Sequence, residues 1–354
     1  VAPSRGLGDV YKRQKGGCWF GAEMSQMMQV NLWTRYASRI LLKVAEGPYR
    51  TEEDIYKLAK SFRWEQYFTP KNTFKIELSS RRSPLKSVAF TALRVKDAVC
   101  DYFRETDGQR PDVEKHDPDI RIYVHLTDKS CIIYLDTSGE SLFKRGWREA
   151  KGEAPLKENL AAGLLGLAGW TPDKPLQDPF CGSGTIPIEA ALIAKNRAPG
   201  LNRSFSAQKW ACVDRELWLR AADEAMDKEF EGDYEIWGGD LDPAAVELAR
   251  RNAELAEVDD IVRFEAADAR TFHWGGMYGR IVTNPPYGER IMERREAEEL
   301  YRAFGKAWAK FPETWKLYLL SSHTEFERTF GKKADKKRKL YNGMLKCDLF
   351  MYLG

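Results

Sequence analysis

The stretch Asp178-Pro179-Phe180-Cys181-Gly182-Ser183-Gly184-Thr185 decides the fold of this chain. It follows the short apolar part of a predicted strand and leads into a predicted helix over residues 186–194. Glycine lets a backbone come close to a ligand, and the free N–H groups at the start of the next helix attract a carboxylate or a phosphate. The stretch therefore predicts a nucleotide-type binding loop, which we call the glycine loop.

Two other nucleotide-binding loops are excluded by the same residues. A Walker loop needs Gly-Lys-Ser/Thr, which the glycine loop lacks. A G-x-G-x-x-G fingerprint needs a third glycine three residues after Gly184, where Pro187 stands. ATP hydrolysis and hydride transfer are therefore both disfavoured.

Acidic side chains follow the next two predicted strands. Residues 236–240 predict a strand that ends in Asp240, and Asp242-Pro243 opens a predicted helix over 244–255. A carboxylate at the end of the second strand of such a unit is placed to accept hydrogen bonds from both ribose hydroxyls. We assign this role to Asp240, with Asp242 as the alternative.

Asp268 follows the third predicted strand, over residues 261–265, and its carboxylate could accept a hydrogen bond from an adenine amine. Taken singly, each of these acids is more often a helix cap or a solvated loop residue. All of these acids come after the glycine loop in the sequence, and each follows a predicted strand. This order favours the interpretation that together they form a cofactor site.

Asn284-Pro285-Pro286-Tyr287 follows the apolar run 281–283. The Asn284 side chain and the Pro285 backbone each offer a carbonyl, and Tyr287 offers a flat ring. Two carbonyls that accept hydrogen bonds from a planar amine draw its nitrogen toward a tetrahedral shape and free its lone pair for alkylation. A proline-rich turn is the simpler alternative, and the glycine loop upstream favours the functional interpretation.

With these motifs in this order, the chain resembles the class I S-adenosylmethionine-dependent methyltransferases. It is more narrowly similar to the bacterial 23S ribosomal RNA guanine-N2 methyltransferases that carry a THUMP RNA-binding domain. The narrower likeness rests on residues 142–148 (LFKRGWR), 154–162 (APLKENLAA), 198–203 (APGLNR), 283–290 (TNPPYGER) and 334–336 (ADK). We expect S-adenosyl-L-methionine as the cofactor, held by Asp178, Phe180, Cys181, Gly182, Ser183, Gly184, Thr185, Asp240, Asp242, Asp268 and Asn284.

The resemblance implies an α/β fold, a Rossmann-like three-layer sandwich, for residues 141–354. Strands at 315–321 and 346–353 would complete a mostly parallel sheet with a hairpin edge. Residues 15–68 would be the remainder of a ferredoxin-like module, and residues 69–140 the THUMP RNA-binding region. Residues 1–14 match nothing in the family, so we expect a cloning or assembly scar there and a module that lacks its first strand and helix.

The N-terminal half has an α+β pattern of its own. Its periodicity predicts helices over 24–44, 51–62 and 87–103, and strands at 73–78, 120–126 and 131–136.

An insertion separates the glycine loop from the ribose acid. Asp240 lies 62 positions after Asp178, whereas a minimal unit places this acid about 20 residues on. The excess is the segment 196–233, and the ribosomal RNA family has a similar insertion. A pair of surface helices that serve packing alone is an equally good explanation.

Length and composition agree with a cytoplasmic enzyme. The 354 residues, 43% of them apolar, suffice for two or three domains, each with a core. No apolar run approaches the roughly 18 residues of a membrane helix, and no signal peptide is visible. The six cysteines and four histidines show no metal-ligand spacing, so we expect reduced thiols and no metal.

Basic charge is concentrated in one segment. The net charge of +3 is too small to attract the whole molecule to RNA, but six of the eight residues 332–339 are Lys or Arg. A solvated, non-binding face is the simpler explanation of any such basic residues. For Arg94 and Lys96, in the N-terminal half of the chain, we prefer that explanation. We expect phosphate contacts from the basic run, defined as Lys332, Lys333, Lys336, Lys337, Arg338 and Lys339.

Our hypothesis is direct methyl transfer to the 2-amino group of a guanine extruded from 23S ribosomal RNA or a large-subunit precursor. Asn284 and Pro285 would hold the amine and Tyr287 would stack on the base. No strong base is required, because the methylated amine is acidic and loses its proton to water or a nearby carbonyl. A monomer is favoured.

Three alternatives stay open. A DNA adenine-N6 methyltransferase or a protein glutamine methyltransferase could use the same tetrapeptide. The tetrapeptide selects a planar nitrogen, whichever kind of substrate carries that nitrogen. A non-enzymatic RNA-binding protein is the third. The intact motifs disfavour a decayed enzyme, and the N-terminal RNA module disfavours a protein substrate.

Overall fold

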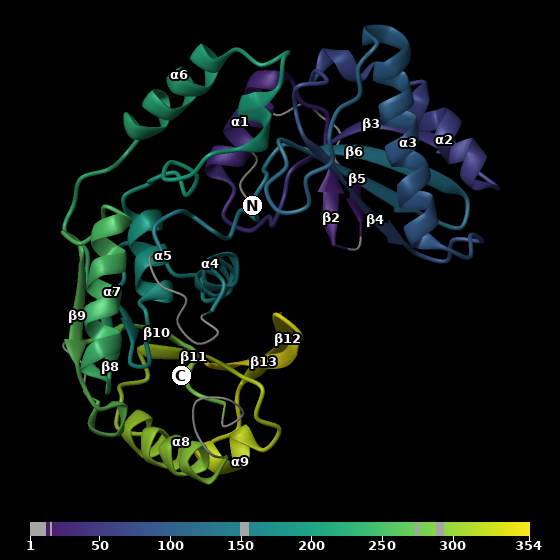
Figure 1. The fold of residues 1–354 in the computed structure, drawn as a ribbon. Coiled ribbons are helices and arrows are strands. Elements are labelled where there is room, and N and C mark those ends of the chain that lie inside the picture. Colours follow the sequence, from purple (N-terminus) through teal and green to yellow (C-terminus); the bar gives the residue numbers. More distant parts are fainter. Residues whose placement is uncertain (1–11, 15, 149–155, 273–275, 288–293) are drawn as a thin grey trace. The chain divides into compact units, whose positions relative to one another are not determined.

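The computed structural model describes residues 12–14, 16–148, 156–272, 276–287 and 294–354. The chain forms two compact units, which Figure 1 shows as ribbons. The N-terminal unit consists of Val1–Leu142 with Arg203–Glu224, and the C-terminal unit of Phe143–Asn202 with Ala225–Gly354. The expected scar at 1–14 lies, apart from 12–14, outside the described residues, and so do parts of the sequence blocks 154–162 and 283–290.

A four-stranded sheet with the order β3-β6-β5-β4 forms the centre of the N-terminal unit. β4 and β5 are parallel, and the other neighbours are antiparallel. α2 and α3 pack together against this sheet (Figure 1). The elements are β1 (Lys12–Gln14), β2 (Gly17–Trp19), α1 (Met24–Trp33), β3 (Leu41–Pro48), α2 (Glu52–Lys60), η1 (Trp64–Gln66), β4 (Phe74–Ser80), α3 (Val88–Asp107), β5 (Ile120–Leu126) and β6 (Ser130–Asp136).

The predicted helix over 24–44 is wrong beyond Trp33. α1 ends there, and the residues from Leu41 form β3, whose backbone pairs with β6. A short apolar run can form either a helix or a strand, and pairing with a strand about 90 residues away decides between them here. The other predicted elements of this unit agree with the structure to within a few residues.

The seven-stranded sheet of the C-terminal unit has the order β12-β13-β11-β10-β7-β8-β9. β7 to β11 are parallel, and β13 and β12 add an antiparallel hairpin at one edge. Strand order reverses at β7, and ligands of such sheets bind where it does, beyond the carboxyl ends of the strands. The strands are β7 (Leu176–Asp178), β8 (Ile236–Asp240), β9 (Val262–Ala266), β10 (Gly279–Thr283), β11 (Trp315–Ser321), β12 (Lys336–Asn342) and β13 (Leu345–Tyr352).

Helices cover the two faces of this sheet and make it a three-layer sandwich. Figure 1 shows α5 and α7 on one side and α8 and α9 on the other. Alternation along β11 reflects these layers, because Leu317 packs into the core beneath α8 and Leu320 into the opposite core. None of the helices among the described residues is both long and apolar enough to cross a membrane. The helices are α4 (Glu158–Leu167), α5 (Thr185–Ala194), α7 (Pro243–Leu255), α8 (Arg294–Trp308) and α9 (Phe326–Phe330).

Most of the insertion between α5 and β8 packs with the N-terminal unit. It includes η2 (Ser206–Lys209) and α6 (Arg215–Met226). Trp210 packs edge-on against Tyr67, with 5.3 Å between ring centroids, and the Ala211 N–H donates to the Tyr67 carbonyl at 2.8 Å. Arg203 donates to the Ser138 carbonyl at 3.1 Å. The insertion therefore completes the N-terminal unit, and the chain passes between the units three times.

Candidate active site

The glycine loop joins β7 to α5 where the strand order reverses. Gly184, just before α5, has a φ of 83°, and a Cβ there would lie 2.9 Å from the Phe264 ring and 3.0 Å from the Ala249 Cβ. Gly182 has a φ of 52°, and nothing lies within 4 Å of an added Cβ. Gly184 thus lets the loop pack against β9 and α7, whereas Gly182 leaves open space beside the backbone.

Asp178 links the glycine loop to β10. Its Oδ1 accepts hydrogen bonds from the Thr283 hydroxyl at 2.6 Å and from the Phe180 N–H at 3.2 Å. Burial raises the pKa of Asp178 to about 7, and the nearby charge of Asp240 acts in the same direction. Because Thr283 directly precedes Asn284, Asp178 helps to hold the strand end from which Asn284 projects.

Asp240 and Asp242 stand at the end of β8 and the start of α7. Asp240 accepts hydrogen bonds from the N–H groups of Gly182, at 2.9 Å, and of Asp242, at 3.0 Å. Asp242 accepts one from the Ala244 N–H at 2.9 Å and thereby caps α7. Carboxylate oxygens keep further lone pairs in this arrangement, so both acids could still accept bonds from a ligand.

Asp268 follows β9 and begins the short helix η3 (Ala269–Thr271). Its two oxygens accept hydrogen bonds from the Arg270 guanidinium at 2.7 to 2.9 Å. These bonds hold the pKa of Asp268 below its usual range. Arg270 is not among the residues predicted from the sequence, where the Asp-x-Arg spacing was the available signal. An adenine amine at Asp268 would share the carboxylate with this guanidinium.

Arg148 is a further residue that the sequence analysis did not assign to the site. Its guanidinium donates to the Ser183 hydroxyl at 2.8 Å, to the Thr185 hydroxyl at 3.0 Å and to the Glu158 carboxylate at 2.9 Å. Arg148 therefore ties α4 to the glycine loop at the N-terminal end of α5, where a ligand carboxylate is favoured, and its own charge is paired with Glu158. The available signal was the block 142–148, which we used only for the resemblance.

Asn284 and Tyr287 contact each other. The Tyr287 hydroxyl donates a hydrogen bond to the Asn284 side-chain oxygen. The Cys347 thiol of β13 lies 3.9 Å from the same hydroxyl, and burial raises the pKa of Tyr287. Tyr287 thus orients the Asn284 amide, whose oxygen keeps a second lone pair for a ligand.

The two prolines of the tetrapeptide have different surroundings. The Pro286 carbonyl accepts a hydrogen bond from the Tyr301 hydroxyl of α8. Among the described residues, no donor bonds the Pro285 carbonyl. Of the two backbone carbonyls, that of Pro285 is therefore the one left to accept a bond from an amine.

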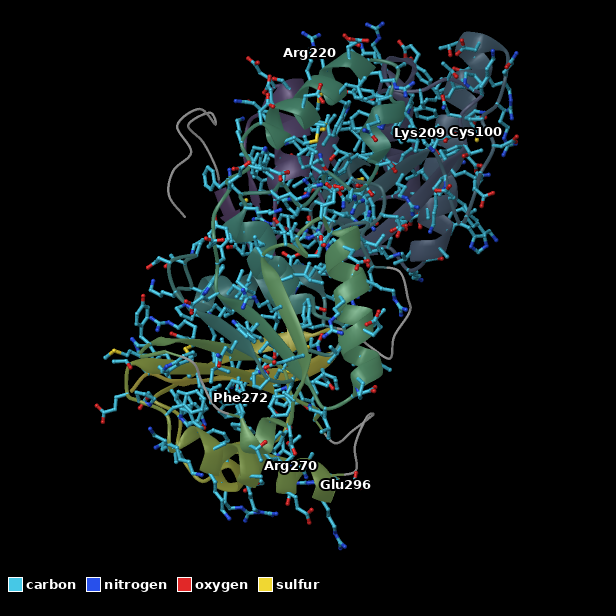
Figure 2. The ribbon with its side chains drawn as sticks, turned by 90° about the vertical axis from the view of Figure 1, so that its left-hand side faces the viewer. Cys100, Lys209, Arg220, Arg270, Phe272 and Glu296 are labelled. Carbon is cyan, nitrogen blue, oxygen red and sulfur yellow. The ribbon has the colours of Figure 1, made fainter. Side chains whose placement is uncertain are left out.

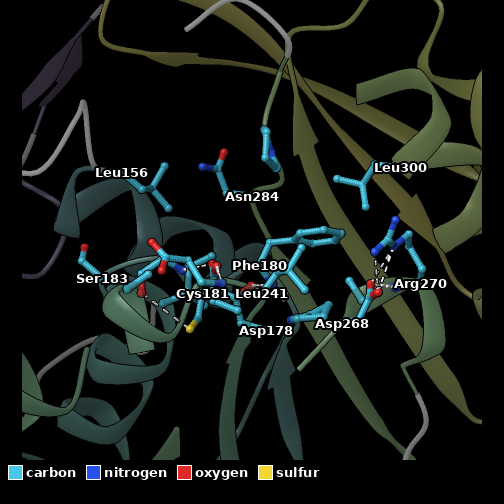
Figure 3. A pocket seen from close by; sticks show the side chains of 18 of the residues that line it. Leu156, Asp178, Phe180, Cys181, Ser183, Leu241, Asp268, Arg270, Asn284 and Leu300 are labelled. Carbon is cyan, nitrogen blue, oxygen red and sulfur yellow. Dashed lines mark hydrogen bonds and ion pairs between the residues drawn. The ribbon is translucent and has the colours of Figure 1, made fainter. Parts of the chain in front are cut away.

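The residues around the glycine loop line a cavity of about 1020 Å³ (Figure 3), large enough for a drug-sized ligand or cofactor. In Figure 3, Phe180 and Asn284 lie around the hollow, and dashed lines join Asp268 to Arg270. Arg270 and Glu296 both line it, and Figure 2 shows them at one end of the unit. Every residue predicted for the cofactor lines it except Gly184, whereas Pro285 and Tyr287 lie outside the described lining.

The basic run does not form one uniform surface. Lys336–Asn342 is the edge strand β12, so successive side chains point to opposite faces of the sheet. Lys337 donates to the Glu327 carboxylate of α9 at 2.6 Å, whereas Lys336 and Arg338 point to the other face.

Fold and site together define a class of enzyme. A glycine loop follows the first strand in the parallel part of the sheet, acids follow the second and third, and Asn-Pro-Pro-Tyr follows the fourth. The open space beside Gly182, the carboxylates beyond β8 and β9 and the N-terminal end of α5 suit a nucleoside with an amino-acid tail. This is a class I methyltransferase, which uses S-adenosyl-L-methionine.

The chain belongs to the RMKL-like methyltransferase family, whose domain model matches residues 145–350. A THUMP domain model matches residues 49–136, and an RlmL ferredoxin-like domain model matches residues 4–41. The last match begins within the residues 1–14 that we expected to match nothing. The domain bounds 15–68, 69–140 and 141–354 remain a proposal.

Known proteins similar to this chain include a ribosomal RNA methyltransferase and two solved structures. Ribosomal RNA large subunit methyltransferase K/L of Shewanella baltica (strain OS185) is 39% identical over 347 residues, which are 96% of this chain and 49% of that protein. The chain thus spans about half the length of this curated relative. A crystal structure of SMU.472 in complex with SAH is 36% identical, covers 97% of this chain and 91% of that one, and has a TM-score of 0.87.

A second solved structure, from Listeria monocytogenes str. 4b F2365, is described as a predicted N6-adenine-specific DNA methylase. It is 36% identical, covers 97% of this chain and 90% of that one, and has a TM-score of 0.89.

Proposed function

We propose that this protein transfers a methyl group from S-adenosyl-L-methionine to the 2-amino group of a guanine in 23S ribosomal RNA. One observation carries the proposal. The Asn284 side-chain oxygen, at the cofactor cavity, keeps an acceptor lone pair, and no donor among the described residues bonds the adjoining Pro285 carbonyl, so both can accept hydrogen bonds from a planar amine. The THUMP match and the name of the Shewanella relative support RNA as the substrate. Such a substrate implies action in the cytoplasm.

The side chains of this protein bind and position the reactants. Bound S-adenosyl-L-methionine supplies a methyl group on a sulfonium, which is already an activated leaving group. Asn284 and Pro285 accept one hydrogen bond each from the target amine, and Tyr287 keeps the Asn284 oxygen turned toward the site. The amine is thereby held in one orientation, and its lone pair is free for attack.

We further propose the contacts that hold the cofactor. Asp240 or Asp242 accepts bonds from the ribose hydroxyls, Asp268 faces the adenine end, and the glycine loop with Arg148 faces the amino-acid end. The geometry of the cavity supports these roles, because all four side chains lie at the carboxyl edge of the parallel strands or beside the glycine loop.

A product analysis tests the proposal. The protein is incubated with undermodified ribosomal RNA and labelled S-adenosyl-L-methionine, and the RNA is then digested to nucleosides. We expect N2-methylguanosine as the main labelled species. Label in N6-methyladenosine, or in protein alone, would contradict the assignment.

Methylation of adenine N6 in DNA is the second candidate. The similarity to the Listeria monocytogenes structure favours it, and adenine presents the same kind of planar amine to Asn284. Undermethylated double-stranded DNA in a parallel reaction distinguishes the two, because only the second candidate predicts labelled N6-methyldeoxyadenosine there.

A further inference from the structure

β12 is the edge strand of the seven-stranded sheet, and its side chains alternate between two faces. One face carries Lys336, Arg338, Leu340 and Asn342, and we call it the Tyr287 face. The other carries Lys337, Lys339 and Tyr341, and we call it the α9 face.

The Tyr287 face borders the tetrapeptide. Leu340 stands opposite Cys347 in the register with β13, and the Cys347 thiol lies 3.9 Å from the Tyr287 hydroxyl. Leu340 and Tyr287 also pack against the same buried cluster. Arg338 precedes Leu340 by two residues on the same face, which places its Cα roughly 7 Å further along the strand.

The positive charges of the two faces have different partners. On the α9 face, Lys337 is paired with Glu327 and lies over the Phe350 ring, and Lys339 stands opposite Asp348. On the Tyr287 face, Lys336 stands opposite Met351 and Arg338 opposite Leu349, so their neighbours across the strands are apolar.

On β12, the charges of the Tyr287 face thus have no acid opposite them and are open to an external anion. Both side chains are exposed, and neither forms an ion pair with any residue that the structure describes. A cation already paired with a carboxylate gains less from a phosphate, whereas an unpaired one releases the counterions of the nucleic acid. Arginine also matches a phosphate with its planar fork.

We propose that Lys336 and Arg338 contact phosphates of the RNA strand that carries the target base, and that Lys337 and Lys339 do not. The inference rests on the proposed function, because it assumes an RNA substrate at Asn284. It narrows the β12 part of the basic run, Lys336 to Lys339, to two residues on the face that leads to Tyr287.

Protection of the sheet edge is the competing explanation. Charged side chains on an edge strand prevent it from pairing with another chain. Charges on either face of β12 would serve that purpose, so the explanation predicts equal effects when two charges are removed from one face or from the other.

Two double variants separate these explanations, because each removes two positive charges from β12. One carries Lys336→Gln and Arg338→Gln, and the matched control carries Lys337→Gln and Lys339→Gln. Binding of labelled fragments of undermodified 23S ribosomal RNA is measured over a range of salt concentrations. Calorimetry of S-adenosyl-L-methionine binding reports whether the C-terminal unit is intact.

We expect the Lys336/Arg338 variant to bind RNA about tenfold or more weakly near physiological salt, with the slope of log K against log salt smaller by roughly 1.4 to 1.8. The control should lose less than about twofold and keep its slope, because Lys337 is paired with Glu327 and Lys339 stands opposite Asp348. Cofactor affinity should be unchanged in both.

Equal losses in the two variants, or a greater loss in the control, would overturn the inference. If the double variant does not fold, the single variants Lys336→Gln and Arg338→Gln are measured in its place. Each should reduce the slope of log K against log salt by about half as much as expected for the double variant. If the wild-type protein makes N2-methylguanosine but the two double variants lose RNA affinity equally, the present inference is refuted and the proposed function is not. A wild-type protein that binds no RNA refutes the proposed function as well.

Discussion

At the scale of single residues, the polar groups of the site hold one another. The Tyr287 hydroxyl orients the Asn284 amide, and Asp178 accepts a hydrogen bond from Thr283, one residue earlier. Asn284 therefore contributes to the proposed reaction through its position, and its removal leaves the glycine loop and the acids beyond β8 and β9 in place.

Asn284→Ala should lower the rate of methyl transfer by about a hundredfold or more, since it removes a positioned contact to the reacting amine. Affinity for S-adenosyl-L-methionine should fall much less than the rate does, because Asn284 is one of many residues expected to hold the cofactor. Single-turnover kinetics with undermodified RNA and calorimetry with the cofactor measure the two effects. Tyr287→Phe keeps the ring and loses only the orienting hydroxyl, so it should be less impaired; near-normal turnover of Asn284→Ala would rule out the proposed role.

Asp178 makes stability depend on pH. Burial raises its pKa from 3.8 to about 7 in the folded protein, so the folded state binds this proton more tightly than the unfolded chain does. The resulting stabilisation is fully present below the unfolded pKa and is lost as the pH rises through about 7. Asp178→Asn removes the titration, while its side-chain oxygen can keep the bonds from Thr283 and Phe180.

We therefore expect the variant to gain stability relative to wild type by about 2 to 3 kcal/mol between about pH 5 and about pH 8. Urea unfolding without cofactor at the two pH values measures this difference. A difference between variant and wild type that is the same at both pH values would show that Asp178 does not titrate in this range.

At the scale of elements, the junction of β8 and α7 gives its two acids separate tasks. Asp240 ties the glycine loop to β8 through the Gly182 N–H, and Asp242 caps α7 through the Ala244 N–H. Asp240 and Asp242 both line the cavity, because they stand between the end of β8 and the start of α7. Only their hydrogen bonds distinguish the two acids.

Asp240→Ala should weaken binding of S-adenosyl-L-methionine by about 1 to 3 kcal/mol, through loss of the ribose contact and of the tie to the glycine loop. Asp242→Ala should chiefly lower the free energy of unfolding by about 1 kcal/mol, the usual effect of losing a helix cap. Calorimetry and urea unfolding of both variants test this. If Asp242→Ala loses cofactor affinity and Asp240→Ala does not, the ribose contact belongs to Asp242.

At the scale of the whole molecule, the insertion interrupts the sequence of the C-terminal unit and folds as part of the N-terminal unit. Arg203–Glu224 lies between two elements of the C-terminal sheet in sequence, yet it packs with the other unit. The segment that we considered as a surface helix pair thus has a structural role in the unit that contains the THUMP match.

Trp210→Ala should lower the stability of the N-terminal unit by about 3 to 5 kcal/mol, as expected for loss of a buried tryptophan. Trp210 is 2% exposed and packs on Tyr67, whereas Leu219, 53% exposed in the same segment, supplies a control as Leu219→Ala. Amide hydrogen exchange in β4 and β5 measures the local stability, and cofactor affinity should stay unchanged. Unaltered protection in Trp210→Ala would contradict a structural role for the insertion.

Local features made much of this protein predictable from its sequence. The segments Trp315–Ser321 and Ile236–Asp240 were both predicted as strands, and the glycine loop with Asp240 and Asn284 indicated the cofactor cavity. These signals depend on residues close in the chain, because backbone conformation and strand periodicity are local properties.

The remaining features depend on contacts between distant residues, and only the tertiary structure decided them. Leu41–Pro48 is a strand because β6 lies beside it, and Trp210 is buried because Tyr67 is its neighbour. The sequence showed one basic segment, whereas pairing with β13 and α9 separates Lys337 from Arg338 by turning them to opposite faces. The sequence by itself determined the class of enzyme and the position of its motifs; burial and pairing across the fold determined which of its charges remain free.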